Sequence, residues 1–90
     1  MNKNFTITDS TSVDDLYDYA VDSLNDVMNG EKFIVNDLFR GFEWKRIPMG
    51  SRTRLGKKFF DHQPVSRNGM PLVKPLGKTA QNQQIYLKTF

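Results

Sequence analysis

The chain has 90 residues, of which 38% are hydrophobic and 12% aromatic, enough for one domain with one modest core. The absence of cysteine excludes a disulfide scaffold, a thiolate zinc site and a cysteine nucleophile. One histidine, His62, cannot form a histidine-rich metal site. No apolar run approaches the roughly 20 residues of a membrane span, and the polar start lacks the apolar segment of a secretory signal. We therefore expect a cytoplasmic protein without metal, cofactor or membrane contact.

The net charge of +3 hides a strong segregation of charge along the chain. Residues 1–31 carry one base and seven acids, a net −6, and residues 32–90 carry twelve bases and three acids, a net +9. Such an asymmetry points to contact with a polyanion. The alternative is that an acidic helix neutralises the basic remainder within one fold.

A helix is predicted over residues 11–30, after a polar segment over residues 1–10 that we expect to be flexible. Thr11 and Ser12 each precede an aspartate three residues later, which approximates a capping box at a helix start. Gly30 is typical of the residue that follows a helix end. Apolar residues recur between these signals at three- and four-residue steps and predict one buried face. That face consists of Val13, Leu16, Tyr17, Ala20, Leu24, Val27 and Met28.

Two short elements follow the first helix. Residues 32–35 are apolar and partly β-branched, and they predict a brief strand. Asn36 or Asp37 can cap a short helix that begins at residue 38 and ends between residues 41 and 44. A turn is expected over residues 47–50, because a proline disfavours helix in the residue before it.

A third helix is predicted from Ser51, as its cap, to about His62. On a wheel of ~100° per residue, one side of this helix is apolar and the opposite side is charged. Arg52 falls on the apolar side, in the first turn, where its long side chain can still reach solvent. The apolar side consists of Leu55, Gly56, Phe59 and Phe60, and the charged side consists of Arg54, Lys57, Lys58 and Asp61.

The chain ends in a predicted β-hairpin. Residues 66–69 form a loop with the asparagine–glycine pair typical of tight turns, and strands are predicted over residues 72–76 and 84–90. Pro75 indicates that the first of these strands lies at a sheet edge or carries a bulge, because proline has no N–H to donate.

The order of helix, short strand, helix, helix and hairpin predicts one α+β domain over residues 11–90. It comprises an acidic helix over residues 11–30 and a basic helix–hairpin body over residues 31–90. This is the order of a winged helix-turn-helix-like fold, with three helices, a short strand and a C-terminal β-hairpin. In such folds the later helix of the pair enters the major groove of DNA and the hairpin is the wing.

Several short motifs lie within residues 32–88. They are Phe33, Asp37-Leu38-Phe39, Trp44-Lys45-Arg46-Ile47-Pro48, Arg54-Leu55-Gly56, Phe59-Phe60, and Leu76-Gly77-Lys78-Thr79-Ala80-Gln81-Asn82-Gln83-Gln84-Ile85-Tyr86. With these motifs the chain resembles a small family of uncharacterised domains from Gram-positive bacteria and their mobile elements. The resemblance implies a winged-helix-like fold. Some members are labelled single-stranded DNA-binding proteins, which implies contact with DNA.

Four basic residues of the third predicted helix are candidates for nucleic-acid binding. Lysines and arginines on one helix face neutralise phosphates and release counterions, the main source of sequence-independent affinity. Arginines early in such a helix can also reach guanine edges in the major groove. The alternative is the solvated face of an ordinary amphipathic helix. The four candidates are Arg52, Arg54, Lys57 and Lys58.

The predicted hairpin offers a second set of candidates, namely Lys74, Lys78, Thr79 and Asn82, next to two glutamines. Their side chains can donate hydrogen bonds to the DNA backbone or to minor-groove edges. The alternative is that these residues serve the turn alone. A phosphate-binding loop is excluded, because Leu72 stands where that loop needs its first glycine.

Aromatic and basic residues alternate over residues 39–46. Proteins that bind single strands stack bases on exposed rings, but the spacing favours Phe39, Phe42 and Trp44 as core residues of a small domain. Lys45 and Arg46 are candidates for phosphate contact.

The aspartates of the first helix lack the spacing of a calcium loop, so they indicate a solvated face that can also repel DNA or dock a basic partner. His62 closes a helix, where it suits the helix dipole. No set of nucleophile, base and orienting group is recognisable, so we predict no catalytic residue and no enzyme. The aspartates are Asp14, Asp15, Asp18, Asp22 and Asp26.

Three hypotheses for function follow. The first is a DNA-binding regulator or accessory factor of a bacterium or mobile element, which contacts double-stranded DNA through the third helix and the hairpin. The second is a protein-interaction adaptor that docks a partner, or a second copy of the chain, through the acidic helix. The third is a single-stranded DNA binder, for which Trp44 fluorescence should be quenched on binding.

Overall fold

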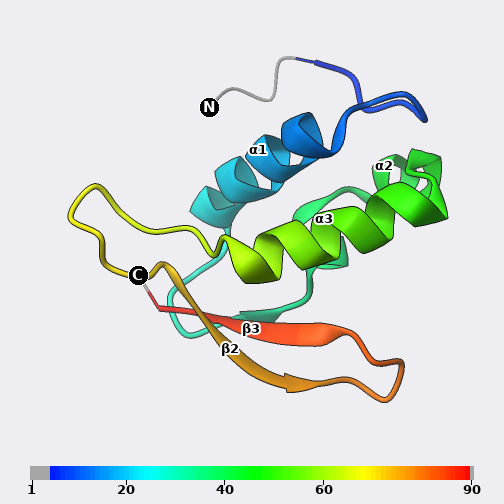
Figure 1. Cartoon of the computed structure of the whole chain (residues 1–90). Coiled ribbons are helices and arrows are strands. Elements are labelled where there is room, and N and C mark those ends of the chain that lie inside the picture. Colours follow the sequence, from blue (N-terminus) through cyan, green and yellow to red (C-terminus); the bar gives the residue numbers. More distant parts are fainter. Residues whose placement is uncertain (1–4, 90) are drawn as a thin grey trace.

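The computed structural model describes residues 5–89, and it shows helices stacked against a small antiparallel sheet (Figure 1). The described residues form three α-helices, two 3₁₀ helices and three strands in the sheet order β1-β3-β2. This confirms the predicted α+β class and is consistent with a winged-helix-like arrangement. The elements are α1 (Val13–Ser23), η1 (Leu24–Asp26), β1 (Lys32–Phe33), η2 (Val35–Leu38), α2 (Gly41–Arg46), α3 (Met49–Asp61), β2 (Val73–Lys78) and β3 (Gln84–Lys88).

Helix α1 begins where the capping pattern predicts and ends earlier than expected. The Ser12 hydroxyl accepts a hydrogen bond of 3.1 Å from the Asp15 amide, which satisfies one free N–H of the first turn. The α-helix ends at Ser23 and continues as η1 to Asp26, so the predicted end at Gly30 is wrong. The reason is tertiary, because Lys88 of β3 binds the carbonyls of Leu24 and Val27 at this point.

The core lies between α1, α3 and the inner face of the sheet. Phe59 of α3 is fully buried, with its ring centroid 5.0 Å from that of Tyr86 and 6.5 Å from that of Phe33. Leu16 of α1 and Leu55 of α3 are also fully buried. These buried side chains hold one side of α3 against α1 and the sheet. The opposite side of the helix does not contact the core.

The segment before α1 packs onto the domain within its described part. Ile7 is fully buried, and the Phe5 ring contacts that of Tyr19 edge to face at 5.9 Å. Phe5 and Ile7 therefore contribute to the core within the segment expected to be flexible, and residues 1–4 of that segment lie outside the described part.

A buried carboxylate joins α1 to α2. Glu43 is 7% exposed and accepts a hydrogen bond of 2.8 Å from the Tyr19 hydroxyl and one of 2.9 Å from the Arg40 amide. Burial, and then the bond to Glu43, raise the pKa of Tyr19 to about 12. The Arg40 amide precedes the first turn of α2, so Glu43 also fixes where this helix begins.

Three predicted boundaries between residues 32 and 51 are wrong. Strand β1 has two residues only, because the chain turns into η2 at Val35. The Asp37 carboxylate accepts a hydrogen bond of 3.0 Å from the Ile34 amide and so caps the start of η2, instead of starting a helix at residue 38. Helix α3 begins at Met49, with Pro48 before it, and not at Ser51. A proline before the first turn needs no N–H there, which permits the earlier start.

The hairpin forms as predicted, with shifted ends. Strand β2 lies at the edge of the sheet and pairs with β3 through Pro75 opposite Tyr86 and Lys78 opposite Gln84. These pairs enclose one extra residue on β2, so Pro75 stands both on an edge strand and beside a bulge. Strand β3 is described to Lys88, and residue 90 of the predicted strand lies outside the described part.

Candidate nucleic-acid interface

Helix α3 lies between α1 and the β2–β3 hairpin (Figure 1). Its buried side, centred on Leu55 and Phe59, faces the core, and the remaining circumference faces α1, solvent or the hairpin. The four candidate basic residues of α3 therefore do not share one direction.

Arg52 turns inward, which corrects the expectation that it reaches solvent. Its Nη2 donates a hydrogen bond of 2.9 Å to the Trp44 carbonyl, and its guanidinium carbon lies 5.1 Å from the centroid of the Trp44 ring. A carbonyl near the end of α2 has a free lone pair, and the face of an indole attracts a cation. Arg52 therefore holds α3 against α2 and is removed from the solvent-exposed interface.

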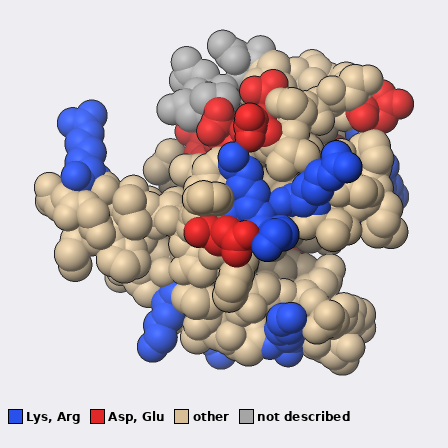
Figure 2. All heavy atoms as spheres, viewed as in Figure 1, with Lys and Arg blue, Asp and Glu red and all other residues tan. Residues whose placement is uncertain are grey.

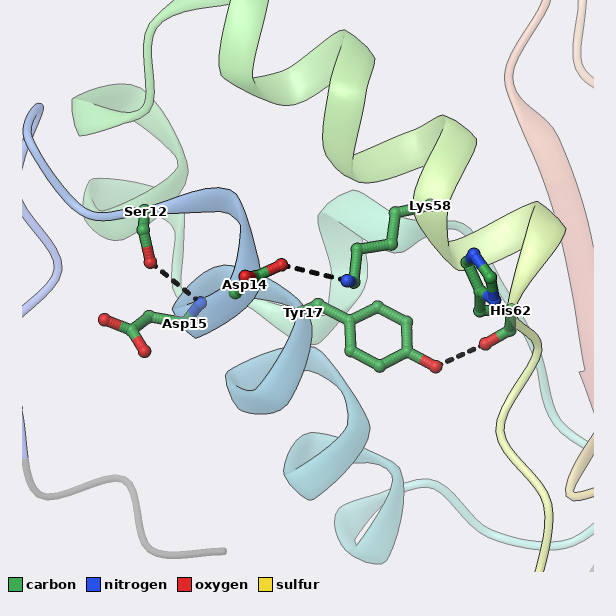
Figure 3. Close-up of polar contacts among 6 residues, drawn as sticks. All are labelled: Ser12, Asp14, Asp15, Tyr17, Lys58 and His62. Atoms are coloured by element: carbon green, nitrogen blue, oxygen red, sulfur yellow. Dashed lines mark hydrogen bonds and ion pairs between the residues drawn. The ribbon is translucent and has the colours of Figure 1, made fainter.

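Lys58 turns toward α1. Its Nζ lies 2.9 Å from Asp14 Oδ1 and 5.1 Å from the centroid of the Tyr17 ring. Figure 3 shows Lys58 reaching from α3 across the Tyr17 ring to Asp14, while Asp15 points away. The hydrogen bond to Asp14 raises the pKa of the Lys58 ammonium, because it favours the charged form. One acidic residue of α1 thus neutralises one basic residue of α3.

Helix α1 also contacts α3 at the C-terminal end of α3. The Tyr17 hydroxyl donates to the His62 carbonyl (Figure 3), and burial raises the pKa of Tyr17. His62 itself is exposed at the C-terminal cap of α3, as its predicted place at a helix end requires.

Arg54 and Lys57 are the basic residues of α3 that remain on the exposed side. The Lys57 side chain is 79% exposed and its Nζ lies 3.0 Å from Asp61 Oδ2, an ion pair between exposed groups. Such pairs are weak, because water and salt screen them. A phosphate can therefore take the place of Asp61 at little cost.

The hairpin brings one further cation and several polar groups to the same region. Lys78 of β2 is exposed and lies near the exposed side of α3. Lys74 is also exposed on β2, but it follows the buried Val73, so its side chain lies on the face of the sheet away from α3. Thr79 and Asn82 form the turn: the Asn82 amide donates to the Thr79 carbonyl at 2.9 Å, and the Gln83 amide donates to Thr79 Oγ1 at 3.2 Å. Asn82 has φ 64°, a left-handed conformation that asparagine tolerates better than most residues. Both residues therefore have a role in the turn, which fits the alternative weighed for them.

Helix α2 contributes two exposed bases, Lys45 and Arg46. Arg46 is also engaged within the fold, because its Nη1 donates to the Ile7 carbonyl at 3.1 Å. The Arg46 guanidinium also lies 5.2 Å from the centroid of the Phe42 ring. Phe42 is 54% exposed, so its assignment to the core is wrong, while Phe39 is buried and Trp44 is partly buried. Phe42 and Trp44 are two residues apart in α2, roughly 200° around the helix, so the two rings cannot face the same side.

Charge is divided in space as it is along the sequence. Figure 2 shows acidic side chains gathered over α1 and basic side chains over α3, with further basic side chains over the hairpin. Among residues 5–89, no three His, Asp or Glu side chains come close enough to hold a metal ion. No helix in this part of the chain is long and apolar enough to cross a bilayer.

Sequence reasoning missed a groove between α3 and the hairpin. Lys57 and Lys78 line it from opposite sides, together with Met49 and Phe60 of α3. Phe60 had been assigned to the apolar side of the helix, but it is 48% exposed. A signal was available in the spacing of Met49, Thr53, Gly56 and Phe60, which places these four residues on one face of the helix.

Residues 18–88 match the family described as a domain of unknown function (DUF1413), and the chain belongs to that family. The match begins within α1, earlier than the resemblance over residues 32–88 implies. Comparisons with curated proteins and with solved structures gave no match.

Proposed function

We propose that this protein binds double-stranded DNA through the exposed side of α3 and the hairpin. The observation that carries the proposal is the convergence of Lys57 and Lys78, which come from different elements and line one groove. The order of the elements and of the strands supports it, since a winged helix presents its later helix and its hairpin to DNA together.

The proposed interface is smaller than the one expected from the sequence. Lys57 and Lys78 form its basic centre, and Arg54, Lys74 and Lys45 are further exposed bases outside the groove. Arg52 and Lys58 are held by Trp44 and Asp14 and act through the positions of α2 and α1. Contacts with phosphates dominate such an interface, so its affinity depends on salt more than on sequence.

The acidic face of α1 supports one orientation of the DNA. Asp15 and Asp18 are exposed on α1, on the side of α3 that lies away from the hairpin. Their charge repels phosphates over a distance of about 10 Å at 0.1 M salt. The DNA therefore lies along the hairpin side of α3 and avoids α1. A non-enzymatic regulator or accessory factor in the cytoplasm of a bacterium, or of a host of its mobile elements, is the role that this surface fits.

Single charge reversals test the interface. We expect Lys57→Glu and Lys78→Glu each to weaken binding to a duplex of 20 base pairs by roughly tenfold at 50 mM salt, because a phosphate contact becomes repulsive. Binding is measured by fluorescence anisotropy with a labelled duplex, and circular dichroism verifies that each variant is folded.

Arg67→Glu is the matched control, because it makes the same change of charge in the exposed loop between α3 and β2 (Figure 1). Its affinity should stay within about twofold of the unmodified protein at the same salt concentration. An equal loss in all three variants would show attraction by net charge alone and would remove α3 and the hairpin as a specific interface.

A further inference from the structure

One face of α3 is apolar, exposed and directed at the hairpin. Met49, Thr53, Gly56 and Phe60 follow one another at steps of four, three and four residues and line the groove between α3 and the hairpin. Met49 is 72% exposed and Phe60 is 48% exposed. A Cβ atom on Gly56 would meet no atom within 4 Å, so the middle of this face is open. The groove therefore has an apolar side chain at each end and free space between them.

The opposite side of the groove is built from carboxamides. Gln81, Asn82 and Gln83 at the tip of the hairpin are exposed and line it, and Asn36 of η2 joins them. A carboxamide both donates and accepts hydrogen bonds. This side therefore matches a ligand that presents N–H and C=O groups in alternation, as an extended peptide backbone does.

Two buried donors beside the groove lack acceptors among the described residues. They are the Tyr86 hydroxyl and Arg52 Nε, and both residues line the groove. Tyr86 is fully buried, and burial raises its pKa to about 12, so the hydroxyl keeps its proton. A buried donor without an acceptor is unfavourable, so the floor of the groove has hydrogen-bonding capacity that the described residues do not use.

The charge of the groove selects an anionic ligand. Lys57 and Lys78 stand on its two sides, and Asp61, its one acidic lining residue in the described part, is already paired with Lys57. From Met49 to Phe60 the helix rises by roughly 16 Å, at about 1.5 Å per residue. About five residues of extended chain, at roughly 3.3 Å each, cover this length.

We propose that the groove between α3 and the hairpin binds an extended segment of a protein partner, with apolar residues for Met49 and Phe60 and carboxylates for Lys57 and Lys78. This site goes beyond DNA binding and shares the two lysines with it, so the partner segment and DNA exclude each other. A nucleic-acid strand fits the groove less well. Each of its nucleotides carries a phosphate, and the groove has two exposed cations and apolar ends.

The test uses the full chain and two blocked peptides. The probe is acetyl-Glu-Leu-Gln-Ala-Gln-Phe-Glu-amide, and the comparison peptide has lysine in place of both glutamates. Trp44 is the single tryptophan and lines the groove, so its fluorescence reports binding, and amide shifts in ¹H–¹⁵N spectra locate the site. We expect the glutamate peptide to shift the amides of α3 and the hairpin tip, and the lysine peptide to bind at least tenfold more weakly.

Two glycine variants make the test specific. Gly56→Leu fills the open middle of the groove, whereas Gly50→Leu adds the same side chain to α3 away from the groove, and neither new Cβ meets an atom within 4 Å. Both changes favour helix, so both variants should fold. We expect Gly56→Leu to weaken the glutamate peptide at least tenfold and Gly50→Leu to leave it unchanged.

Three results would overturn the proposal. They are equal binding of the two peptides, unchanged affinity in Gly56→Leu, and a single-stranded oligothymidine that shifts the groove amides when the glutamate peptide does not. The last result would assign the groove to nucleic acid. Duplex binding is measured separately on the same variants, so failure of the peptide site and failure of the DNA interface are distinguished.

Discussion

Replacing Phe59 with alanine is expected to lower the free energy of unfolding by about 4 kcal/mol, a large share of the stability of a small domain. Phe59 is fully buried, and its ring contacts those of Tyr17, Phe33 and Tyr86. Alanine leaves a cavity where α1, α3 and the sheet meet, and these elements cannot close it without losing other contacts. The measurement is urea unfolding, followed by far-ultraviolet circular dichroism.

Phe60→Ala is the matched control on the neighbouring residue. Phe60 is 48% exposed in the groove, so its truncation should cost about 1 kcal/mol or less. Equal losses of unfolding free energy in the two variants would mean that α3 is rotated about its axis. The rotation of the helix decides which of the two adjacent side chains faces the core.

Replacing Lys88 with methionine is expected to cost about 3 kcal/mol. Lys88 is 8% exposed, and its Nζ donates 2.9 Å hydrogen bonds to the carbonyls of Leu24 and Val27. Methionine keeps the length of the side chain but has no donor. The Val27 carbonyl therefore loses the Lys88 ammonium, and among the described residues the Leu24 carbonyl keeps only the Val27 amide as its donor. The loss is measured by the same unfolding experiment.

Lys32→Met is the control for this variant. Lys32 is exposed on β1, beside the same central strand β3, and its ammonium is not needed inside the fold. Its replacement should change the stability by less than about 0.5 kcal/mol. A loss in Lys88→Met no larger than that in Lys32→Met would contradict the buried position of the Lys88 ammonium.

Some features of the fold could be predicted from the sequence. Phe59 follows from the three- and four-residue spacing of apolar residues, and the edge position of Pro75 follows from its missing N–H. Both depend on the chemistry of one element. The order of the elements, from which the α+β class and the hairpin were predicted, also depends on local sequence signals.

The fate of the charged residues could not be predicted in this way. Lys58, Arg52 and Lys88 all count toward the net +9 of residues 32–90. In the structure Lys58 is paired with Asp14, Arg52 with Trp44, and Lys88 is buried beneath η1. A long cationic side chain reaches any acceptor within several ångströms, so its direction depends on which element the fold brings near. The net +9 of residues 32–90 therefore overstates the charge that faces solvent.

The groove was missed for a related reason. The spacing of Met49 to Phe60 shows that four residues share a face, but it does not show whether another element covers that face. The hairpin leaves it open, since β2 and β3 bend past α3 without filling the space above Gly56. Such openings depend on the curvature of the sheet. The bulge after Pro75 increases that curvature, because a bulge bends and twists its strand.

Binding of double-stranded DNA by α3 and the hairpin is tested most directly by the salt dependence of the unmodified protein's affinity for a duplex of 20 base pairs. Lys57 and Lys78, with Arg54 exposed on the same helix, predict a slope of log affinity against log salt of about −2 to −3, at roughly −0.9 for each phosphate contact. A lack of measurable binding at about 50 mM salt, where such contacts are strongest, or a slope no steeper than about −1, would contradict the proposed interface.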